Sequence, residues 1–270
     1  MKIKEINDIE VRPVPVQKKD KREILGSELF SEIYSNIYLC ARKKSGKSTV
    51  IYNIIKRCCD INTQVYVFCS TSTKDANWQG IRDYLDKKGI YSEFHYSIKS
   101  DDGKQNYLKE LVDRLQTEES DSSGSEPEPE EEKVLLFDED EIKVTIKKRK
   151  PKKIAPKYII IFDDISTELK DPNISHLLKT NRHYKSKVII SSQWLNDIPP
   201  MARRQIDVYL IFSGVNQDKL LELFNNSDLN INFDEFINLY KEATSEKYSF
   251  FYVDASNCKY RVNFNREIVV

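Results

Sequence analysis

The chain has 270 residues, enough for one large α/β domain or for one domain that carries an insertion. Hydrophobic residues make up 39% of the sequence, so a packed core is expected, and 43 basic and 43 acidic residues give zero formal charge. Any contact with nucleic acid must therefore come from local patches. No apolar run approaches the roughly 20 residues of a membrane span, and the first residues lack the apolar centre of a secretory signal. We expect a soluble protein that is not exported by that route and does not enter a membrane.

Apolar runs of strand length alternate with segments of helical period along the chain. Strands are expected at 36–40, 64–70, 93–96, 158–162, 188–192, 208–212, 248–253 and 259–264. Helices are expected at 49–57, 78–88, 105–116, 174–184, 217–224 and 233–243. This alternation predicts an α/β fold with a mainly parallel sheet covered by helices on both faces. The last two strands predict a C-terminal β-hairpin that turns at 255–257.

Composition divides the chain into three parts. Residues 1–30 read as an N-terminal arm, 31–116 and 157–270 as the folded domain, and 117–156 as a low-complexity insertion. The acidic run 117–132 is too polar and too uniformly charged to be buried, which predicts disorder. Two short segments after it, 134–137 and 142–146, alternate in polarity and could pair as a hairpin. The basic tract 147–153 could follow a phosphate backbone or direct nuclear import, or it could be a solvated linker that balances the acidic run.

The segment 41–48, ARKKSGKS, lies between an expected buried strand and an expected helix. It matches the phosphate-binding pattern G-x-x-x-x-G-K-[ST] at Gly46, Lys47 and Ser48 and differs at Ala41. In this motif backbone N–H groups bind phosphate oxygens, the lysine neutralises the β- and γ-phosphates, and the hydroxyl ligates Mg²⁺. The alternative is a lysine-rich helix start with an accidental GKS. The nucleotide-binding residues that we expect are Ala41, Arg42, Lys43, Lys44, Ser45, Gly46, Lys47, Ser48 and Thr49.

The first position of this loop departs from the motif. If Ala41 has to adopt a positive φ, its Cβ costs on the order of 1 kcal/mol. The loop would then be strained but still able to form.

A nucleotide phosphatase of this kind also needs an apolar strand that ends in a carboxylate. The segment VLLFDED offers the pair Asp138 and Glu139, which matches the expected letters better, but it lies between an acidic and a basic run and fits poorly in a buried sheet. The segment YIIIFDD offers Asp163 and Asp164 and is followed by a helix and another apolar strand. We assign Asp163 to the Mg²⁺ ion and Asp164 to the attacking water. Taken alone, IIIFDD could also be an ordinary strand end.

Three further polar residues are candidates for catalysis. Gln193 ends the apolar run VIISSQ, where its amide could lie between the γ-phosphate and the attacking water, although a solvated strand cap is the alternative. Arg182 follows the helix after Asp164, and Arg203 follows the pair Pro199-Pro200. An arginine from a neighbouring subunit can stabilise negative charge on the transferring phosphoryl group, and either arginine could do so. Both could equally be ordinary surface residues.

The ordered set of these motifs resembles the viral genome-packaging ATPases of the FtsK–HerA superclass, in particular the poxvirus-type branch. The resemblance rests on KKSGKST, YIIIFDDIS, NRHYKSKVIISSQ, PPMARRQIDVYLIF and SFFYVDASNCKYRVNF, and it spans about residues 33–265 without the insertion. It implies a P-loop NTPase with a RecA/FtsK-like fold. Lys47, Ser48, Asp163, Asp164 and Gln193 fall on the functional positions of that family. Where many members of the superclass carry glutamate, this chain has Asp164.

The resemblance also implies a role and partners. The protein would use ATP and Mg²⁺ to move double-stranded DNA into a preformed capsid, as a homo-oligomeric ring that contacts a capsid or portal-vertex protein. It would act at the viral assembly site in the host cytoplasm or travel with the virion. Two alternatives come from other classes: a nucleotide-binding virion assembly factor with little hydrolysis that acts as a structural switch, and a small-molecule kinase. The kinase is disfavoured because the chain has no evident acceptor pocket or lid.

Overall fold

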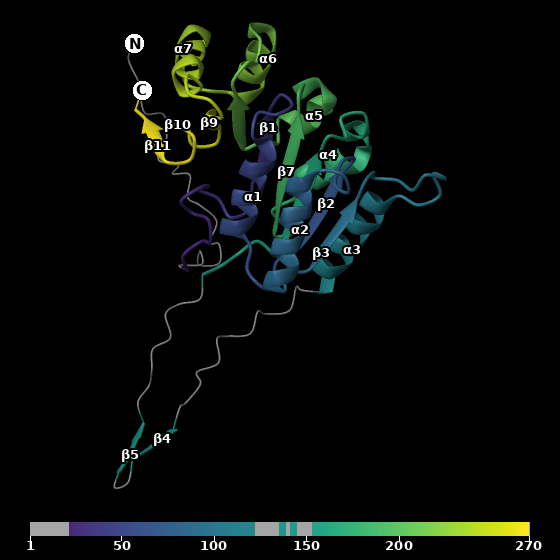
Figure 1. Cartoon of the computed structure of the whole chain (residues 1–270), viewed down its shortest axis with the longest axis vertical. Helices are drawn as coiled ribbons and strands as arrows, with labels where there is room; N and C mark the ends of the chain where they lie inside the picture. Colours follow the sequence, from purple (N-terminus) through teal and green to yellow (C-terminus); the bar gives the residue numbers. More distant parts are fainter. Residues whose placement is uncertain (1–21, 122–134, 139–140, 145–152, 270) are drawn as a thin grey trace, which may run out of the picture.

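The central feature of the computed structural model is one sheet of nine strands, in the order β11-β10-β9-β8-β1-β7-β6-β2-β3 (Figure 1). The structure describes residues 22–121, 135–138, 141–144 and 153–269. Strands β3, β2, β6, β7, β1 and β8 run parallel to one another, and β9, β10 and β11 continue the sheet with antiparallel pairing. The predicted α/β class with a mainly parallel sheet is therefore confirmed.

The strands of the main sheet follow the apolar runs of the sequence. The central strands are buried along nearly their whole length, as expected for a sheet with both faces covered. Their bounds are β1 Asn36–Cys40, β2 Gln64–Cys69, β3 Ser92–His95, β6 Tyr158–Asp163, β7 Ser186–Ser192, β8 Val208–Phe212, β9 Phe250–Asp254, β10 Lys259–Val262 and β11 Arg266–Ile268.

The helices cover both faces of this sheet. Alternate residues of β1 point to opposite faces: Ile37 and Leu39 pack with α1 and α2, whereas Tyr38 packs with α3, α4, α6 and α7. The bounds are α1 Lys47–Cys58, α2 Ala76–Lys88, α3 Tyr107–Asp121, α4 Pro172–Thr180, α5 Pro200–Arg203, α6 Gln217–Ser227 and α7 Phe233–Ala243, with 3-10 turns η1 Glu168–Lys170 and η2 Leu195–Asp197. Among the residues that the structure describes, no helix is both long and apolar enough to cross a bilayer.

The insertion contributes one hairpin to the described residues. Strands β4, Leu135–Asp138, and β5, Glu141–Val144, pair antiparallel with each other in a separate sheet. The predicted hairpin is thus present, and the VLLFDED strand is not part of the main sheet. Helix α3 continues to Asp121, so the start of the acidic run is helical where disorder was predicted. The rest of that run and most of the basic tract lie outside the described residues.

Three further details differ from the sequence predictions. Leu29 and Phe30, at the end of the predicted arm, are buried in the core, and Ile24 bridges to Ile154. Helix α4 stops at Thr180, so the residues up to Tyr184 form a turn instead of a last helical turn. The edge strand β11 was not predicted, because it has only three residues.

Strand order places the loops of interest at one edge of the sheet. β7 lies between β1 and β6, and all three strands are parallel. The segments that follow them therefore emerge together at the carboxyl edge, where parallel sheets bind ligands. Register places Asp163 beside Ser191 of β7, which in turn lies beside Leu39 of β1.

One lysine is buried in the core near the opposite edge. Lys187 of β7 is 1% exposed; its ammonium donates to the Ser35 hydroxyl at 2.7 Å and the Glu32 carbonyl at 3.1 Å, and it lies 4.6 Å from the Phe30 ring centroid. Burial lowers the pKa of Lys187 from 10.5 to about 8, because the charged form loses its hydration. This lysine ties the segment before β1 to the sheet.

The titration of Lys187 predicts a pH-dependent stability. Between pH 8 and 10.5 the unfolded chain binds more protons at this side chain than the folded chain, so its contribution to the free energy of unfolding rises with pH. Lys187→Met removes that titration. The free energy of unfolding of the wild type, minus that of the variant, should therefore increase from pH 7.5 to pH 9.5 in urea titrations. Lys179→Met, at an exposed position on α4, controls for the loss of a surface charge. A difference that is constant with pH would contradict the prediction.

Candidate functional site

The loop between β1 and α1 contains two residues with left-handed backbone conformation. Within it, positive φ occurs at Lys44 (63°) and Gly46 (96°) and does not occur at Ala41. Ala41 is 4% exposed, and its N–H donates to the Ser192 carbonyl of β7 at 3.3 Å. The cost considered for a Cβ at Ala41 therefore does not arise. Lys44 adopts the left-handed conformation, at a cost of about 1 kcal/mol, and Gly46 adopts it without steric penalty.

The N-terminus of α1 is open to an anion. Its N-cap, Gly46, has no side chain to accept from the first N–H groups, and the first turn contains no acidic residue. By contrast, α2, α4, α6 and α7 are capped by side chains, including a capping box of Asn232 and Glu235 on α7. The Ser45 hydroxyl in the same loop is buried without a hydrogen-bond partner. Free N–H groups, the positive end of the helix dipole and an unpaired hydroxyl favour a bound phosphate.

Lys47 joins this loop to the end of β6. Its ammonium lies 2.8 Å from Asp163 Oδ1 and 2.6 Å from Asp164 Oδ1. The Lys47 side chain is 13% exposed and that of Asp163 only 1%, so little solvent screens their attraction. Burial acts to lower the pKa of Lys47, but the two carboxylates outweigh burial and raise the pKa above its ordinary value. Lys47 is therefore a fixed positive charge at neutral pH.

Asp163 is held in place by two residues of neighbouring elements. Its Oδ2 accepts from the indole N–H of Trp78 at 3.2 Å and from the Cys69 thiol at 3.8 Å. Trp78 is fully buried on α2, and Cys69 ends β2, the strand beside β6. The other oxygen, Oδ1, is buried and has only its ion pair with Lys47, without a well-formed hydrogen bond. One oxygen is thus fixed by the protein, and the other faces the loop.

Asp164 has a left-handed backbone, with φ 54°. The Ser70 hydroxyl donates to its carbonyl at 2.8 Å, which helps to fix the turn after β6. Aspartate adopts positive φ more readily than longer side chains do. This conformation gives a physical reason for aspartate at a position where glutamate would add a methylene. The carboxylate is one-third exposed, so water can reach it.

Gln193 directly follows β7, which lies between β1, the strand before the phosphate loop, and β6, the strand that ends in Asp163. The turn after it is held by Ser192, whose hydroxyl contacts the Tyr38 hydroxyl at 3.0 Å and donates to the Trp194 carbonyl at 2.7 Å. Gln193 is half-buried at the carboxyl edge. Strand order thus places it near Lys47, Asp163 and Asp164.

Among the described residues, neither candidate arginine is paired with Lys47, Asp163 or Asp164. Arg203 is 13% exposed; its Nε donates to the Ile198 carbonyl at 2.7 Å, and its guanidinium pairs with Glu222 at 3.2 Å. Ile198 lies just before α5 and Glu222 lies on α6, so Arg203 is bound within its own chain.

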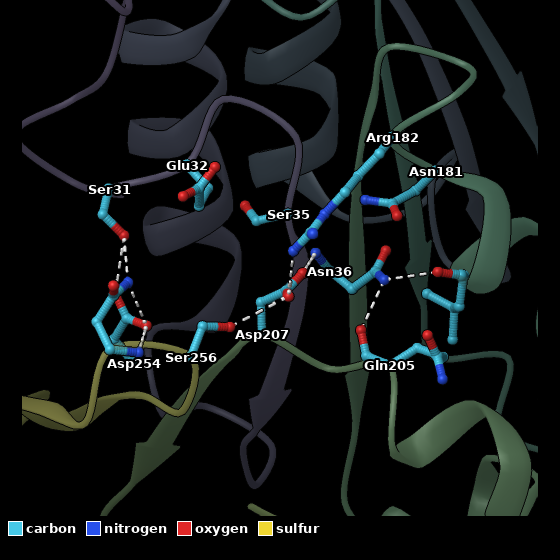
Figure 2. A network of polar contacts seen from close by, with 12 residues as sticks. Ser31, Glu32, Ser35, Asn36, Asn181, Arg182, Gln205, Asp207, Asp254 and Ser256 are labelled. Carbon is cyan, nitrogen blue, oxygen red and sulfur yellow. Dashed lines mark hydrogen bonds and ion pairs between the residues drawn. The ribbon is translucent and has the colours of Figure 1, made fainter. Parts of the chain in front are cut away.

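Arg182 lies at the opposite edge, where β1 and β8 begin (Figure 2). Its guanidinium is 3.2 Å from Asp207 and 62% exposed. The same carboxylate accepts from the Asn36 N–H at 2.7 Å, and Asn36 also donates to the Gln205 carbonyl at 2.7 Å. Burial raises the pKa of Asp207, although the Asn36 hydrogen bond and Arg182 act in the opposite direction. The guanidinium of Arg182 is thus paired with Asp207 within its own chain, although most of its side chain is exposed to solvent.

The oxygen atoms at the carboxyl edge of the sheet are suited to a magnesium ion that is also bound by nucleotide phosphates. Ser48 lies in the first turn of α1 beside Lys47, and among the described residues Asp163 Oδ1 is paired only with that lysine. Mg²⁺ is usually held by one or two carboxylates together with phosphate oxygens and water. Within the described part of the chain, no cluster of three His, Cys, Asp or Glu residues could hold a metal. The site therefore has the donors for a nucleotide-bound ion and lacks those of a closed metal centre.

Sequence reasoning missed the residues that position Asp163. Trp78 reads as a core residue of an amphipathic helix, and Cys69 as the end of a buried strand. Their contacts with Asp163 depend on the neighbouring position of β2 and β6, which only the folded sheet provides. The remaining loop residues are placed at the surface: Arg42, Lys43, Lys44 and Thr49 are exposed.

Comparisons with known proteins agree with this architecture. The family described as "Poxvirus A32 protein" matches residues 127–264, just over half of the chain. A curated relative, "Uncharacterized protein 075L" of Invertebrate iridescent virus 6, is 30% identical over 127 residues, which are 44% of this chain and 49% of the relative. The chain thus spans about half the length of that relative. The family match begins after the phosphate loop. The assignment of that loop therefore depends on its sequence motif and its geometry in this structure.

Solved structures share the fold. The genome packaging NTPase B204 of Sulfolobus turreted icosahedral virus 2, in complex with AMPPCP, has a TM-score of 0.52 at 16% identity, over 85% of this chain and 97% of that one. B204 of Sulfolobus Turreted Icosahedral Virus, described as a DNA-packaging ATPase, has a TM-score of 0.52 at 15% identity, over 84% and 95%. At these identities the likeness shows the fold alone, a P-loop NTPase fold. Together with the family match it confirms the predicted resemblance: the chain belongs to the Poxvirus A32 protein family.

Proposed function

We propose that this protein hydrolyses ATP and uses that hydrolysis to move double-stranded DNA into a capsid, as a ring of identical subunits. The observation that carries the proposal is the convergence of Lys47, Asp163 and Asp164 beside the open N-terminus of α1. Membership of the Poxvirus A32 protein family and the fold shared with packaging NTPases support it. The proposed site of action is the assembly site in the host cytoplasm or the virion, with a capsid or portal-vertex protein as partner.

The proposed chemistry begins with exchange of the Lys47 ion pairs. The triphosphate offers Lys47 a stronger cluster of negative charge than the two carboxylates, so the ammonium turns to the β- and γ-phosphates. Ser48 and Asp163 would then hold Mg²⁺, which neutralises developing charge on the phosphate oxygens. Asp164 is freed to orient or deprotonate the attacking water, and Gln193 contacts the γ-phosphate or that water.

Arg182 is the stronger candidate for an arginine that acts in a neighbouring subunit. Both arginines have an ion pair, Arg203 with Glu222 and Arg182 with Asp207. Arg203 is only 13% exposed, whereas Arg182 is 62% exposed and lies at the edge opposite its own nucleotide site. An arginine that serves another subunit has to be accessible and distant from the site of its own chain. Arg182 meets both conditions.

The first prediction tests hydrolysis. Lys47→Ala should reduce ATP turnover about 100-fold or more, because it removes the ammonium group that stabilises negative charge on the transferring phosphoryl group. Lys56→Ala, at an exposed position near the end of α1 and outside the loop, should retain turnover, and duplex DNA should stimulate the wild type. Phosphate release, measured with and without duplex DNA, checks both. Full turnover by Lys47→Ala would refute the assignment of the nucleotide site to Lys47 and its neighbours. Tight ATP binding with negligible turnover by the wild type, with or without DNA, would favour a structural switch.

The second prediction concerns Trp78, a positioning residue for Asp163. Trp78→Phe keeps an aromatic ring in the core but removes the N–H that fixes Asp163 Oδ2. The Mg²⁺ concentration for half-maximal ATP turnover should rise about 10-fold, as for other residues that orient a metal ligand. The control is Trp194→Phe, at the other tryptophan, which is 47% exposed. An unchanged Mg²⁺ requirement in folded Trp78→Phe would contradict the role.

The third prediction separates the two arginines. Arg182→Ala should reduce the rate of ATP turnover about 1,000-fold, and Lys47→Ala alone should also show almost no turnover. A mixture of the two should regain part of the turnover, because the Lys47→Ala subunit supplies Arg182 to a neighbour with an intact loop. Arg203→Ala mixed with Lys47→Ala should show no such recovery. Absence of recovery in the Arg182 mixture, with ring assembly confirmed by light scattering, would exclude action of Arg182 across subunits.

A further inference from the structure

Tyr248 is an exposed aromatic residue in contact with the phosphate loop. It lies between α7 and β9, and its side chain is 57% exposed. A Cβ built on Gly46 would lie 3.6 Å from Tyr248 Cδ1, so the ring lies directly against the loop at the start of α1. Neither the family match nor the predicted site residues assign a role to it.

The backbone of Tyr248 is held in an unfavourable conformation. Its φ is 67°, which is rare for a bulky aromatic residue and costs on the order of 1–2 kcal/mol. The surrounding structure fixes this turn: the Ser249 N–H donates to the Glu246 carbonyl at 3.2 Å, and β9 begins at Phe250. Strain of this kind is common where a side chain is held at a binding site.

Strand order shows on which side of the loop Tyr248 lies. Asp163 and Asp164 end β6, on the β7 side of β1, whereas Tyr248 precedes β9, on the β8 side. Phe250 pairs with Phe212 at the end of β8, so Tyr248 is at the same carboxyl edge as the loop. A triphosphate with its γ-phosphate at Asp164 and its other phosphates along the loop therefore places its nucleoside toward Tyr248.

Two further contacts line the same side. The Arg42 guanidinium lies against Gly214, where an added Cβ would be 3.2 Å from its NH1 atom. Gly214 has φ 82° and follows β8, so the loop after β8 also borders the phosphate loop. Lys247 Nζ is 4.8 Å from the centroid of the Tyr248 ring. One cation thus lies beside the ring, and more than half of Tyr248 is exposed.

We propose that Tyr248 is the platform on which the nucleotide base stacks, so that a purine ring is held on the β8 side of the phosphate loop. This inference rests on the proposed nucleotide site. Stacking of a base on an aromatic ring is tolerant of base identity, because every base has a π-face. The platform would therefore add affinity for nucleosides generally, with adenine as one acceptable base.

Binding of ATP and of inorganic tripolyphosphate, which has no base, tests the role of Tyr248. Tyr248→Ala should weaken ATP binding about 10-fold in calorimetric titrations, because one base–aromatic stack is lost, and should leave tripolyphosphate binding unchanged. Tyr248→Phe should bind both ligands like the wild type. Tyr91→Ala, at a 53% exposed tyrosine that precedes the outer strand β3, is the matched control.

The outcomes separate this inference from the proposed function. An equal loss for both ligands would mean that Tyr248 only supports the loop, and no loss would mean that the base does not reach it; each overturns the inference. A wild type that binds tripolyphosphate as tightly as ATP overturns it as well. Because binding is measured without turnover, a wild type that binds ATP but does not hydrolyse it refutes the proposed hydrolysis and leaves the base platform supported.

Discussion

The structure of the site depends on the attraction between one ammonium group and two carboxylates. Asp163 and Asp164 are adjacent in the chain and would repel each other if both were charged and unpaired. Lys47 lies 2.8 Å from the first and 2.6 Å from the second, and solvent barely reaches Asp163 although Asp164 is one-third exposed. The same contacts connect the start of α1 to the end of β6 across β7. Charge balance therefore sets the relative position of the phosphate loop and the carboxylates before any nucleotide binds.

The sequence predicts the sheet and the central part of the site because both depend on local patterns. Apolar runs of five to seven residues identified the main strands, and the pattern GKS between a strand and a helix located the loop at Lys47. The rest depends on contacts between distant segments. Trp78 reaches Asp163 only because α2 packs on the sheet, and Tyr248 reaches Gly46 only because β9 pairs with β8. No periodicity in the sequence encodes such contacts.

The conformations of single residues were equally inaccessible. The sequence suggested strain at Ala41, whereas the left-handed residues of this region are Lys44, Gly46 and Asp164. The sequence also left Arg182 and Arg203 equivalent as candidates. Exposure separates them: Arg203 is 13% exposed and paired with Glu222, whereas Arg182 is 62% exposed and paired with Asp207 at the opposite edge. Burial of a charged side chain follows from packing, so composition alone does not reveal it.

β1 connects the two edges of the molecule through only five residues. At its carboxyl end it leads into the phosphate loop, and at its amino end the Asn36 N–H is bonded to Asp207, the carboxylate that also holds Arg182. Pairing with β7 on one side and β8 on the other restrains this strand. The phosphate loop and the carboxylate that pairs with Arg182 are therefore positioned by the two ends of the same short segment. If the subunits form the proposed ring, β1 would link the pocket of one subunit with the arginine proposed to serve the next.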